Sequence, residues 1–462
     1  MAVRSRRSSH KRNARNEGRL PRNAAPISVT ITHIGGRGDG VGTVRYTHNY
    51  QEADYSVFVP ASLPGETIIA QPLSISKQGI KARILELKSA AASRQPPQCN
   101  AFPACGGCSF QHWTPTEIDR WKHQLITHHL ERVHVNAATI RPALISPAKS
   151  RRRASFHIKR LADTAVVGFH ERMGAHIIDP DGCTIIDPRL ASLKTALVEF
   201  ALAYLPVGST IEARANQLES GAGGASHTGL CLYLQNNAAQ PLWTADIQRA
   251  LCAWSADQHL ARLSIDDHDS PLTIYAPAHP TVRFGAIDVT PPPGAFLQAT
   301  EHGEHSLQQA VAEILAGHAY VADLFAGCGT LSLPLIDQLS AVLAVESDSA
   351  ALAALKAGVD AAGQGSRLSI KQRNLFDEPL LPDELTKITG VIIDPPRSGA
   401  LAQCHQLADA DVATIAMVSC NPASFARDAA CLTSAGFTLD WVQPVDQFSY
   451  SNHLELVGAF TR

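Results

Sequence analysis

Residues 319–335 read AYVADLFAGCGTLSLPL. An apolar run that ends in Asp323 is followed by a loop with Gly327 and Gly329, and then by a pattern typical of a helix. Small residues in such a loop let backbone N–H groups and a helix N-terminus approach a ligand closely. The next apolar run ends in Glu346, where a carboxylate can accept both ribose hydroxyls of a nucleoside. The stretch therefore predicts a doubly wound, Rossmann-like α/β sheet with a nucleoside site.

The glycine loop lacks the GxGxxG pattern of dinucleotide sites. This absence disfavours a ligand with a pyrophosphate and favours a mononucleoside ligand such as S-adenosylmethionine. The alternative is an ordinary loop followed by a solvated carboxylate.

Two further apolar runs end in polar loops. TGVIID (389–394) runs into PPRSGA, and TIAMV (414–418) runs into SCNPAS. The carboxyl ends of parallel strands meet at one edge of a doubly wound sheet, and ligands bind at that edge. We therefore expect Asp394, Arg397 and Cys420 to lie together there.

The chain has 462 residues, which exceeds the usual size of one hydrophobic core, so two or three domains are expected. Strand and helix patterns alternate over 286–462, where we predict the α/β domain. Short β-branched runs separated by Gly and Pro predict an OB-like antiparallel barrel over 27–88. We predict a central α+β domain over 89–285 and a basic disordered arm over 1–26.

Positive charge is concentrated at the N-terminus. The net charge is −2, but the first 22 residues hold eight Lys or Arg against the single acidic residue Glu17. This pattern favours an arm that binds a polyanion, with a solvated tail or an organelle transit peptide as alternatives. No apolar run is long enough to span a bilayer. Ten cysteines without a secretory signal favour a reducing compartment, so we expect the cytoplasm.

Four cysteines have the spacing of a metal or cluster site. Cys99, Cys105 and Cys108 follow the pattern C-x5-C-x2-C, and Cys183 follows after 74 further residues. Three thiolates on a glycine-rich turn and a distant fourth can close around one cubane iron–sulfur cluster. Four thiolates also suit zinc, but zinc sites tend to have paired CxxC knuckles, and only one CxxC occurs here.

Several motifs together resemble one family, the S-adenosylmethionine-dependent RNA 5-methyluridine methyltransferases. The resemblance is to the branch that has an N-terminal TRAM barrel and a [4Fe-4S] cluster and acts on 23S rRNA. It extends over nearly the whole chain from residue 27. The motifs are GGRGDGVG, CGGC with its flanking cysteines, FLQ (296–298), DLFAGCG, IIDPPRSG, VSCNPASFARD and NHLEL.

The resemblance implies covalent catalysis by Cys420. Carbon 5 of uracil is a poor nucleophile, but a thiolate that adds to carbon 6 turns the ring into an enolate whose carbon 5 can attack a methyl group. The resemblance also implies Glu455 as the base that removes the proton from carbon 5. Arg397 is expected to steady the enolate or a phosphate, or to form a structural ion pair. The alternative for Cys420 is a thiol that only packs.

The resemblance also implies the ligands. The predicted contacts of S-adenosylmethionine are Gln298, Phe325, Thr330, Glu346, Asn374 and Asp394. The predicted ligands of the [4Fe-4S] cluster are Cys99, Cys105, Cys108 and Cys183. The chain departs from the common pattern at Thr330 and Thr300, where relatives often carry Asn, although a Thr hydroxyl can still donate and accept.

We expect an RNA partner, most specifically 23S rRNA, and neither a membrane nor an obligatory protein partner. The arm, the barrel and Arg151–Arg153 are the expected RNA-binding elements, and Phe296 is expected either to stack on an extruded uracil or to lie in the core. The alternatives are a tRNA uridine-5 methyltransferase, an amino-group RNA methyltransferase, or a non-catalytic iron–sulfur RNA-binding protein. The loop after Asp394 continues with Pro395 and Pro396 and then Arg397 rather than an aromatic residue, which disfavours amino-group chemistry.

Overall fold

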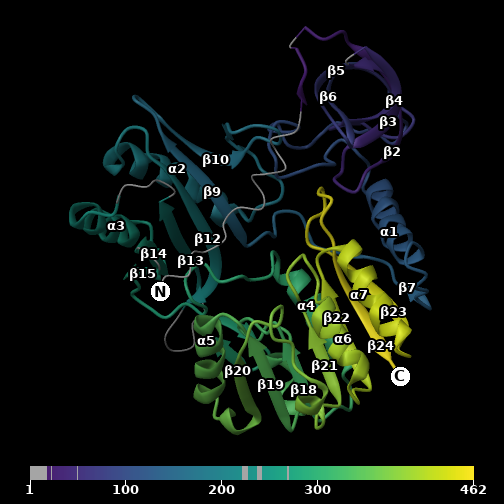
Figure 1. The fold of residues 1–462 in the computed structure, drawn as a ribbon. Coiled ribbons are helices and arrows are strands. Elements are labelled where there is room, and N and C mark those ends of the chain that lie inside the picture. The colour runs from purple at the N-terminus through teal and green to yellow at the C-terminus, as the bar shows by residue number, and fades with distance from the viewer. Residues whose placement is uncertain (1–17, 22, 49, 221–226, 237–241, 268–269) are drawn as a thin grey trace, which may run out of the picture. The chain divides into compact units, whose positions relative to one another are not determined.

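The computed structural model describes residues 18–21, 23–48, 50–220, 227–236, 242–267 and 270–462 (Figure 1). Most of the predicted basic arm therefore lies outside the described residues. The chain divides into two compact units. The first comprises Met1–Gln98, Cys108–Trp121 and Tyr450–Asn452, and the second comprises Cys99–Gly107, Lys122–Ser449 and His453–Arg462.

The first unit is built on a closed β-barrel. Its strands are β1 (Gly18–Arg19), β2 (Ile27–Ile34), β3 (Gly40–His48), β4 (Gln51–Val59), β5 (Thr67–Ser76) and β6 (Gly79–Ser89). The order β1-β5-β2-β3-β4-β6, with a further pairing of β5 and β6, closes five strands into a ring and attaches β1 to it. Alternate residues of β2, such as Ile27 and Val29, are buried because strand side chains point alternately to opposite faces. The predicted N-terminal barrel is confirmed.

The glycine-rich residues 35–39 form the hairpin turn between β2 and β3. Gly35 N donates to Asp39 O at 2.8 Å, and Gly38 N donates to Gly35 O at 2.8 Å. Helix α1 (Pro115–Glu131) has its first residues in this unit, where Trp121 Nε1 donates to Ile34 O at 3.3 Å. The stretch is therefore a structural element of the barrel unit.

The second unit contains a central sheet in the order β11-β10-β9-β12-β13-β14-β15. Helices α2 and α3 pack on it through one apolar core that includes Leu197, Leu251 and Ile211. α2 begins with the N-cap Asp187 and with Pro188 at its first position, a combination typical of helix starts. The elements are β9 (Arg153–Arg160), β10 (Ala165–His170), β11 (Ile177–Ile178), α2 (Pro188–Tyr204), β12 (Thr210–Ser220), β13 (His227–Asn236), α3 (Ala245–Asp257), β14 (Arg262–Asp267) and β15 (Ser270–Tyr275).

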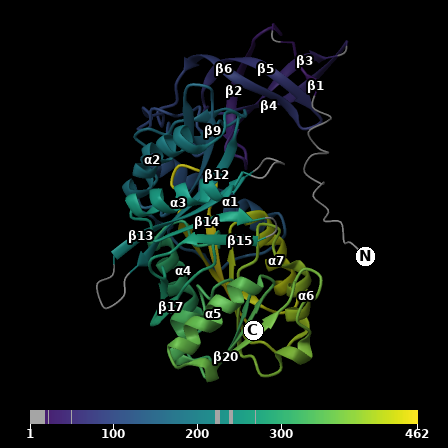
Figure 2. The ribbon, with the colours of Figure 1, turned by 90° about the vertical axis from the view of Figure 1, so that its left-hand side faces the viewer.

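The same unit contains a largely parallel sheet with the order β20-β19-β18-β21-β22-β24-β23-β7 (Figure 1), and Figure 2 shows the molecule turned by 90°. Its elements are β18 (Tyr320–Leu324), β19 (Ala341–Glu346), α5 (Ser349–Ala361), β20 (Leu368–Gln372), β21 (Gly390–Ile393), α6 (Leu401–Asp409), β22 (Thr414–Ser419), α7 (Pro422–Ser434), β23 (Thr438–Asp446) and β24 (Glu455–Thr461). α4 (Glu301–Ile314) precedes them, β7 (Thr139–Ile140) and β8 (Leu144–Ile145) pair with β23, and β16 (Val282–Phe284) pairs with β17 (Ile287–Val289). The chain runs outward from β18 and returns at β21, so the order reverses between these two strands. The predicted doubly wound sheet is confirmed.

Helices cover both faces of this sheet. Leu307 of α4 and Leu355 of α5 belong to one apolar core, whereas Leu407 of α6 and Phe425 of α7 belong to another. All six residues of β22 are buried, as expected for a central strand that is covered on both faces. The core therefore holds the carboxyl ends of the strands at one fixed edge.

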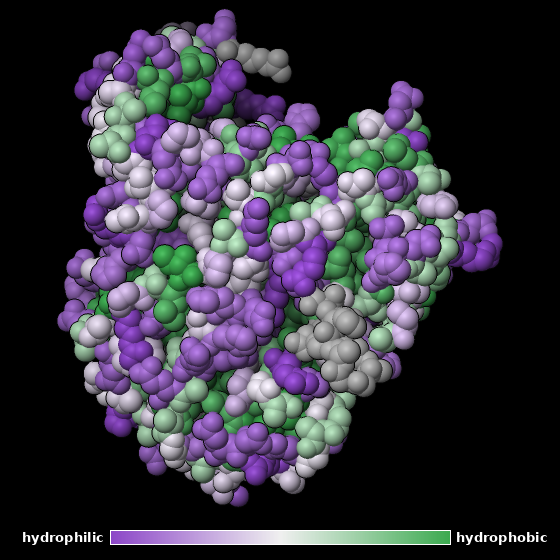
Figure 3. Space-filling view, turned by 180° about the vertical axis from the view of Figure 1, so that it is seen from behind, coloured by the Kyte–Doolittle hydropathy of each residue, from purple (hydrophilic) through white to green (hydrophobic). Residues whose placement is uncertain are grey.

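Hydrophilic and hydrophobic residues are interspersed over the face that Figure 3 shows. Within the described ranges, none of the helices combines the length and the apolar character that crossing a bilayer requires.

Candidate active site

The glycine loop lies at the carboxyl end of β18. Phe325 has a φ of 62°, which is uncommon for a residue other than glycine, and such backbone strain is found preferentially at functional sites. Gly329 has a φ of 85°, and a Cβ atom at this position would lie 2.7 Å from Leu333 Cγ. Only glycine fits at position 329 without strain, and it lets the chain turn tightly after β18.

Glu346 holds the glycine loop against the end of β19. Its Oε2 accepts a hydrogen bond from Gly327 N at 3.1 Å, and its Oε1 accepts from Ser347 N at 2.6 Å and Asp348 N at 2.9 Å. These bonds fix the direction of the carboxylate. The structure thus brings the two elements of the predicted nucleoside site together.

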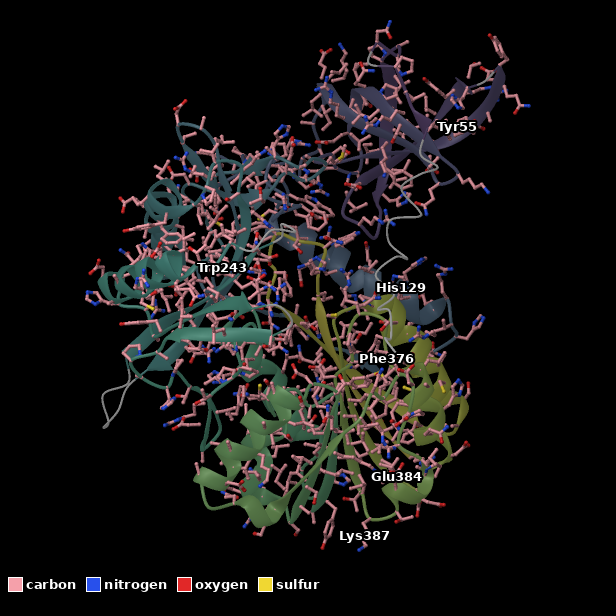
Figure 4. The ribbon with its side chains drawn as sticks, turned by 60° about the vertical axis from the view of Figure 1, so that its left-hand side comes forward. Tyr55, His129, Trp243, Phe376, Glu384 and Lys387 are labelled. Atoms are coloured by element: carbon pink, nitrogen blue, oxygen red, sulfur yellow. The ribbon has the colours of Figure 1, made fainter. Side chains whose placement is uncertain are left out.

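An aromatic pair extends this site. The rings of Phe325 and Phe376 are 5.4 Å apart with an interplanar angle of 53°, and Phe376, labelled in Figure 4, is exposed. Asn374 Oδ1 accepts from Phe376 N at 3.2 Å, and Asn374 Nδ2 donates to Asp377 Oδ2 at 2.5 Å. Asn374 therefore shapes the turn that carries Phe376. Phe376 belongs to no motif of the sequence, and its position two residues after Asn374 is the one local signal that points to it.

The FLQAT segment (296–300) lies before α4. Gln298 and Thr300 are buried, and Thr300 Oγ1 caps α4 by accepting from Gly303 N at 3.0 Å. Thr300 is therefore the N-cap residue of α4. Further along α4, Gln308 Nε2 donates to Thr330 O at 3.0 Å, so the helix also holds the glycine loop.

The loops after β21 and β22 are joined by hydrogen bonds. Asn421 Nδ2 and Ser424 Oγ both donate to Arg397 O, at 3.0 and 3.1 Å. Asp428 Oδ2 accepts from Ala400 N at 2.6 Å. The residues that follow Cys420 in the SCNPASFARD motif therefore hold the loop that contains Asp394 and Arg397.

Three of the predicted site residues are electrostatic neighbours. Burial raises the pKa of Asp394 to about 7. Burial, and after it the charge of Asp394, raises the pKa of Glu455 to about 8. Burial raises the pKa of the Cys420 thiol to about 11, and the charges of Glu455 and Asp394 contribute to this shift. A cationic ligand beside these groups would favour the charged forms of both carboxyl groups and of the thiol.

Arginines oppose this negative charge. Arg397 lowers the pKa of both Cys420 and Glu455, and Arg153 lowers that of Glu455. The Arg153 guanidinium carbon lies 4.4 Å from the ring centroid of Phe296, and Phe296 is 65% exposed. The alternative that Phe296 is a core residue is therefore wrong.

The arginine triplet makes contacts inside the protein. Arg152 Nη2 donates to Glu304 Oε2 at 2.5 Å, and Arg152 Nε donates to Gln298 O at 3.3 Å. The guanidinium carbon of Arg151 lies 5.3 Å from the ring centroid of Phe448. Arg152 thus stabilises the FLQAT segment, a role that the basic run alone did not indicate.

The four predicted cluster cysteines are free thiols, with Cys108 in the first unit and the other three in the second. Burial raises the pKa of Cys105, and the charges of Cys183 and Cys99 add to this shift. Gly107 N donates to Cys105 Sγ at 3.5 Å, and Gln111 Nε2 donates to Cys108 Sγ at 3.6 Å. Among the described residues, no three His, Cys, Asp or Glu side chains converge closely enough to hold a metal ion. The cluster therefore stays a prediction.

Known proteins with similar sequences are RNA methyltransferases. An RNA methyltransferase of Brucella suis biovar 1 (strain 1330) is 34% identical over 434 residues, which cover 94% of this chain and 97% of the relative. One from Caulobacter vibrioides is 33% identical over 437 residues, which cover 94% and 99% of the two chains. The 23S rRNA (uracil(1939)-C(5))-methyltransferase of Alteromonas naphthalenivorans is 29% identical over 454 residues, which cover 95% and 90%.

The fold is similar to a solved structure. The tRNA (uracil-54, C5)-methyltransferase of Pyrococcus abyssi, in complex with S-adenosyl-L-homocysteine, matches with a TM-score of 0.68 and 19% identity over 94% of this chain and 99% of that one. No protein-family model matches the chain. The family that the motifs predict is confirmed by sequence identity along nearly the whole chain: this protein belongs to the S-adenosylmethionine-dependent RNA methyltransferases, the family that includes the uracil-C5 enzymes.

Proposed function

We propose that this protein transfers a methyl group from S-adenosylmethionine to carbon 5 of a uridine in RNA, through a transient bond between Cys420 Sγ and carbon 6. The observation that carries the proposal is the position of Cys420. It follows the last residue of β22, next to Glu455 at the start of the paired strand β24, with Asp394 and Arg397 on the neighbouring loop. A thiol, a base and an arginine at one edge of the sheet are the groups that this reaction needs.

In the proposed reaction Cys420, the methyl donor and Glu455 act in turn. The thiolate of Cys420 adds to carbon 6, and the electron pair of the 5,6 double bond moves into the enolate. Carbon 5 then takes the methyl group, which S-adenosylmethionine supplies as an electrophile on a sulfonium. Glu455 removes the proton from carbon 5, and the electron pair re-forms the double bond as the bond from carbon 6 to sulfur breaks. The products are 5-methyluridine, S-adenosylhomocysteine and a proton.

The protonation states determine when the reaction can start. Without ligands, the pKa of about 11 keeps Cys420 protonated at neutral pH, and the pKa of about 8 keeps most of Glu455 protonated. A positive charge beside Asp394 lowers the pKa of all three groups. Binding of the sulfonium therefore favours both the thiolate and the carboxylate base.

The proposed contacts of S-adenosylmethionine have groups that suit its parts. Glu346 suits the ribose hydroxyls, Phe325 suits an aromatic base, and Asp394 suits the sulfonium charge. Gln298, Thr330 and Asn374 complete the proposed set. The fixed direction of the Glu346 carboxylate and the glycine loop beside it support this assignment.

We also propose a [4Fe-4S] cluster on Cys99, Cys105, Cys108 and Cys183. The donors suit it chemically, because they are four thiols and two of them accept N–H···S hydrogen bonds of the kind that surrounds cluster sulfurs. Polar methyl transfer needs no electron transfer, so a structural or RNA-positioning role fits. Zinc is the alternative metal.

The proposed RNA is 23S rRNA, and the proposed compartment is the cytoplasm. The name of the Alteromonas relative supports the first of these, whereas the name of the Pyrococcus structure keeps tRNA as the second candidate. The barrel, which we propose to be a TRAM domain, and the N-terminal arm would bind RNA through basic residues.

The test uses full-length protein with 23S rRNA and tRNA made without 5-methyluridine. Mass spectrometry of the nucleosides should show 5-methyluridine in 23S rRNA, and RNA containing 5-fluorouridine should trap an adduct on the peptide that contains Cys420. Cys420→Ala should abolish both signals. Cys431→Ala removes a different half-buried thiol, which lies on α7, and should retain both signals. Turnover by Cys420→Ala, or a methylated exocyclic nitrogen, would overturn the proposal.

A further inference from the structure

Gln447 forms a buried amide link between β23 and the FLQAT segment. Gln447 is the first residue after β23, and it is 2% exposed. Its Oε1 accepts a hydrogen bond from Thr300 N at 3.1 Å, and its Nε2 donates to Gln298 Oε1 at 2.8 Å. Two glutamines that are 149 residues apart in the sequence are thus joined in series.

The direction of both amides follows from the backbone. A backbone N–H can only donate, so the end of Gln447 that faces Thr300 must be its oxygen. Its NH2 group then faces Gln298, which must present its own oxygen. The NH2 group of Gln298 is consequently turned away from Gln447. Gln298 Nε2 donates no hydrogen bond within the described chain. It also does not belong to the fully buried polar atoms without a partner, so solvent reaches it. It is therefore open to a ligand.

The surroundings keep this arrangement in place. A Cβ atom on Gly303 would lie 2.2 Å from Gln447 Cγ, so the glycine leaves the room that the amide needs. Arg152 N donates to Ala299 O at 2.9 Å and Arg152 Nε donates to Gln298 O at 3.3 Å. These two bonds fix the backbone of the FLQAT segment. The amide of Gln447 then determines which end of the Gln298 amide faces the ligand.

We infer that Gln447 is a positioning residue, which orients the amide of Gln298 so that it meets its ligand only as a hydrogen-bond donor. The inference rests on the proposed function, and it defines the recognised group as an acceptor oxygen. Two oxygens of that chemistry would come to this site: the carboxylate of the methionine moiety of the methyl donor, and a carbonyl of uracil. A ligand that presents an N–H group to Gln298 is rejected, because the amide cannot turn its oxygen outward without breaking its bond to Gln447.

The test is the variant Gln447→Glu. One carboxylate oxygen can still accept from Thr300 N, but the other cannot donate to Gln298. Gln298 therefore turns to donate to the carboxylate, and it presents its oxygen to the ligand. We expect affinity or catalytic efficiency to fall by about 10- to 100-fold, as when a buried acceptor loses its donor. Gln447→Met removes the link without reversing it, and we expect a loss of only about two-fold, since half of the amide orientations stay productive.

The matched control is Gln443→Glu. Gln443 lies on β23, four residues before Gln447, and is 7% exposed, and its Nε2 donates to Pro142 O at 2.7 Å and Pro444 O at 3.0 Å. This variant also introduces a buried carboxylate on β23 but leaves Gln298 untouched, so it should bind and react like the wild type. Thermal unfolding of all variants checks that each one folds.

Two binding probes and one kinetic assay identify the oxygen. Calorimetry with S-adenosylhomocysteine and with 5′-methylthioadenosine, which lacks the carboxylate, should show a loss for the first probe alone if Gln298 binds the carboxylate. Unchanged calorimetry together with a lower kcat/KM on RNA would identify a uracil carbonyl. Wild-type behaviour of Gln447→Glu in every assay, or equal losses in Gln447→Glu and Gln447→Met, would overturn the inference. Calorimetry needs no turnover, so it distinguishes this failure from a wild-type protein that makes no 5-methyluridine.

Discussion

Cys420 directly follows β22 and Glu455 begins the antiparallel strand β24, so each lies one residue beyond the pair formed by Ser419 and Leu456. Residues that are opposite each other on paired strands are close neighbours. Next to burial, the charge of Glu455 is the largest influence that raises the pKa of Cys420. The proposed nucleophile and the proposed base are therefore coupled in charge as well as in position.

Replacing the base should stop the reaction after methyl transfer. For Glu455→Gln we expect kcat to fall by about 10²- to 10⁴-fold, the range typical of a lost general base. Because the proton stays on carbon 5, the sulfur–carbon bond cannot break, and a methylated adduct should accumulate on natural RNA. Intact-protein mass spectrometry would detect it. Product release at the wild-type rate would show that another group removes the proton.

The pH profile should report Glu455. The carboxylate must be unprotonated to accept a proton, and its pKa in the folded protein is about 8. We therefore expect the rate at which the methylated adduct releases 5-methyluridine, followed in a single turnover, to rise with pH and to level off above about pH 8. The pH profile of Glu455→Gln should lack this rise. A flat wild-type profile between about pH 6 and 9 would contradict the assignment.

Alkylation of Cys420 should be slow at neutral pH and respond to neighbouring charges. Its pKa of about 11 leaves little thiolate, which is the reactive form. Glu455→Gln removes a negative charge. The pH at which alkylation by iodoacetamide reaches half its maximal rate should therefore fall. Arg397→Met removes a positive charge and should move it to higher pH. Peptide mass spectrometry at Cys420 measures these rates, and shifts in the opposite directions would contradict the site electrostatics.

A buried ion pair joins α1 to the end of β23. Lys122 Nζ lies 2.6 Å from Asp446 Oδ2, and the two side chains are 2% and 5% exposed. Lys122→Met leaves a carboxylate buried without its cation, so we expect a loss of about 3–5 kcal/mol in the free energy of unfolding. The double variant Lys122→Met, Asp446→Leu removes both charges and should lose much less. Urea unfolding measures both, and equal losses would contradict this account.

Glu384 should make stability depend on acid pH. Hydrogen bonds from Arg373 and Lys371 lower its pKa to about 2 from an ordinary 4.5. A depressed carboxylate pKa stabilises the fold above the unfolded-state value, so this contribution is present above about pH 4.5 and is lost as the pH falls towards 2. Glu384→Gln should therefore be less stable than the wild type at about pH 6. The difference should narrow at about pH 3 in urea unfolding, and a constant difference would exclude this linkage.

The local patterns identified much of the fold and of the site. Strand, glycine loop and helical pattern follow each other within twenty residues around Asp323, and they indicated the doubly wound sheet. The helix expected after this loop is only a short 3₁₀ helix, Leu333–Gln338. The loops that contain Asp394 and Cys420 follow buried strands, and parallel strands end at a common edge. The sequence was enough to predict that these two loops lie side by side, as the hydrogen bond from Asn421 Nδ2 to Arg397 O shows.

The chain alone did not determine how distant segments pair. Gln298 and Gln447 are 149 residues apart, and Arg152 and Glu304 are 152 apart. Neither pair has a local pattern, because glutamine and arginine are ordinary surface residues until the fold buries them. The exposed ring of Phe296 and the inward contacts of the arginine triplet also depend on the packing of separate elements. The sequence thus determined which chemical groups are present and at which strand ends they stand. The tertiary structure decided the partners of these groups, because burial and hydrogen bonding between distant segments exist only once the chain has folded.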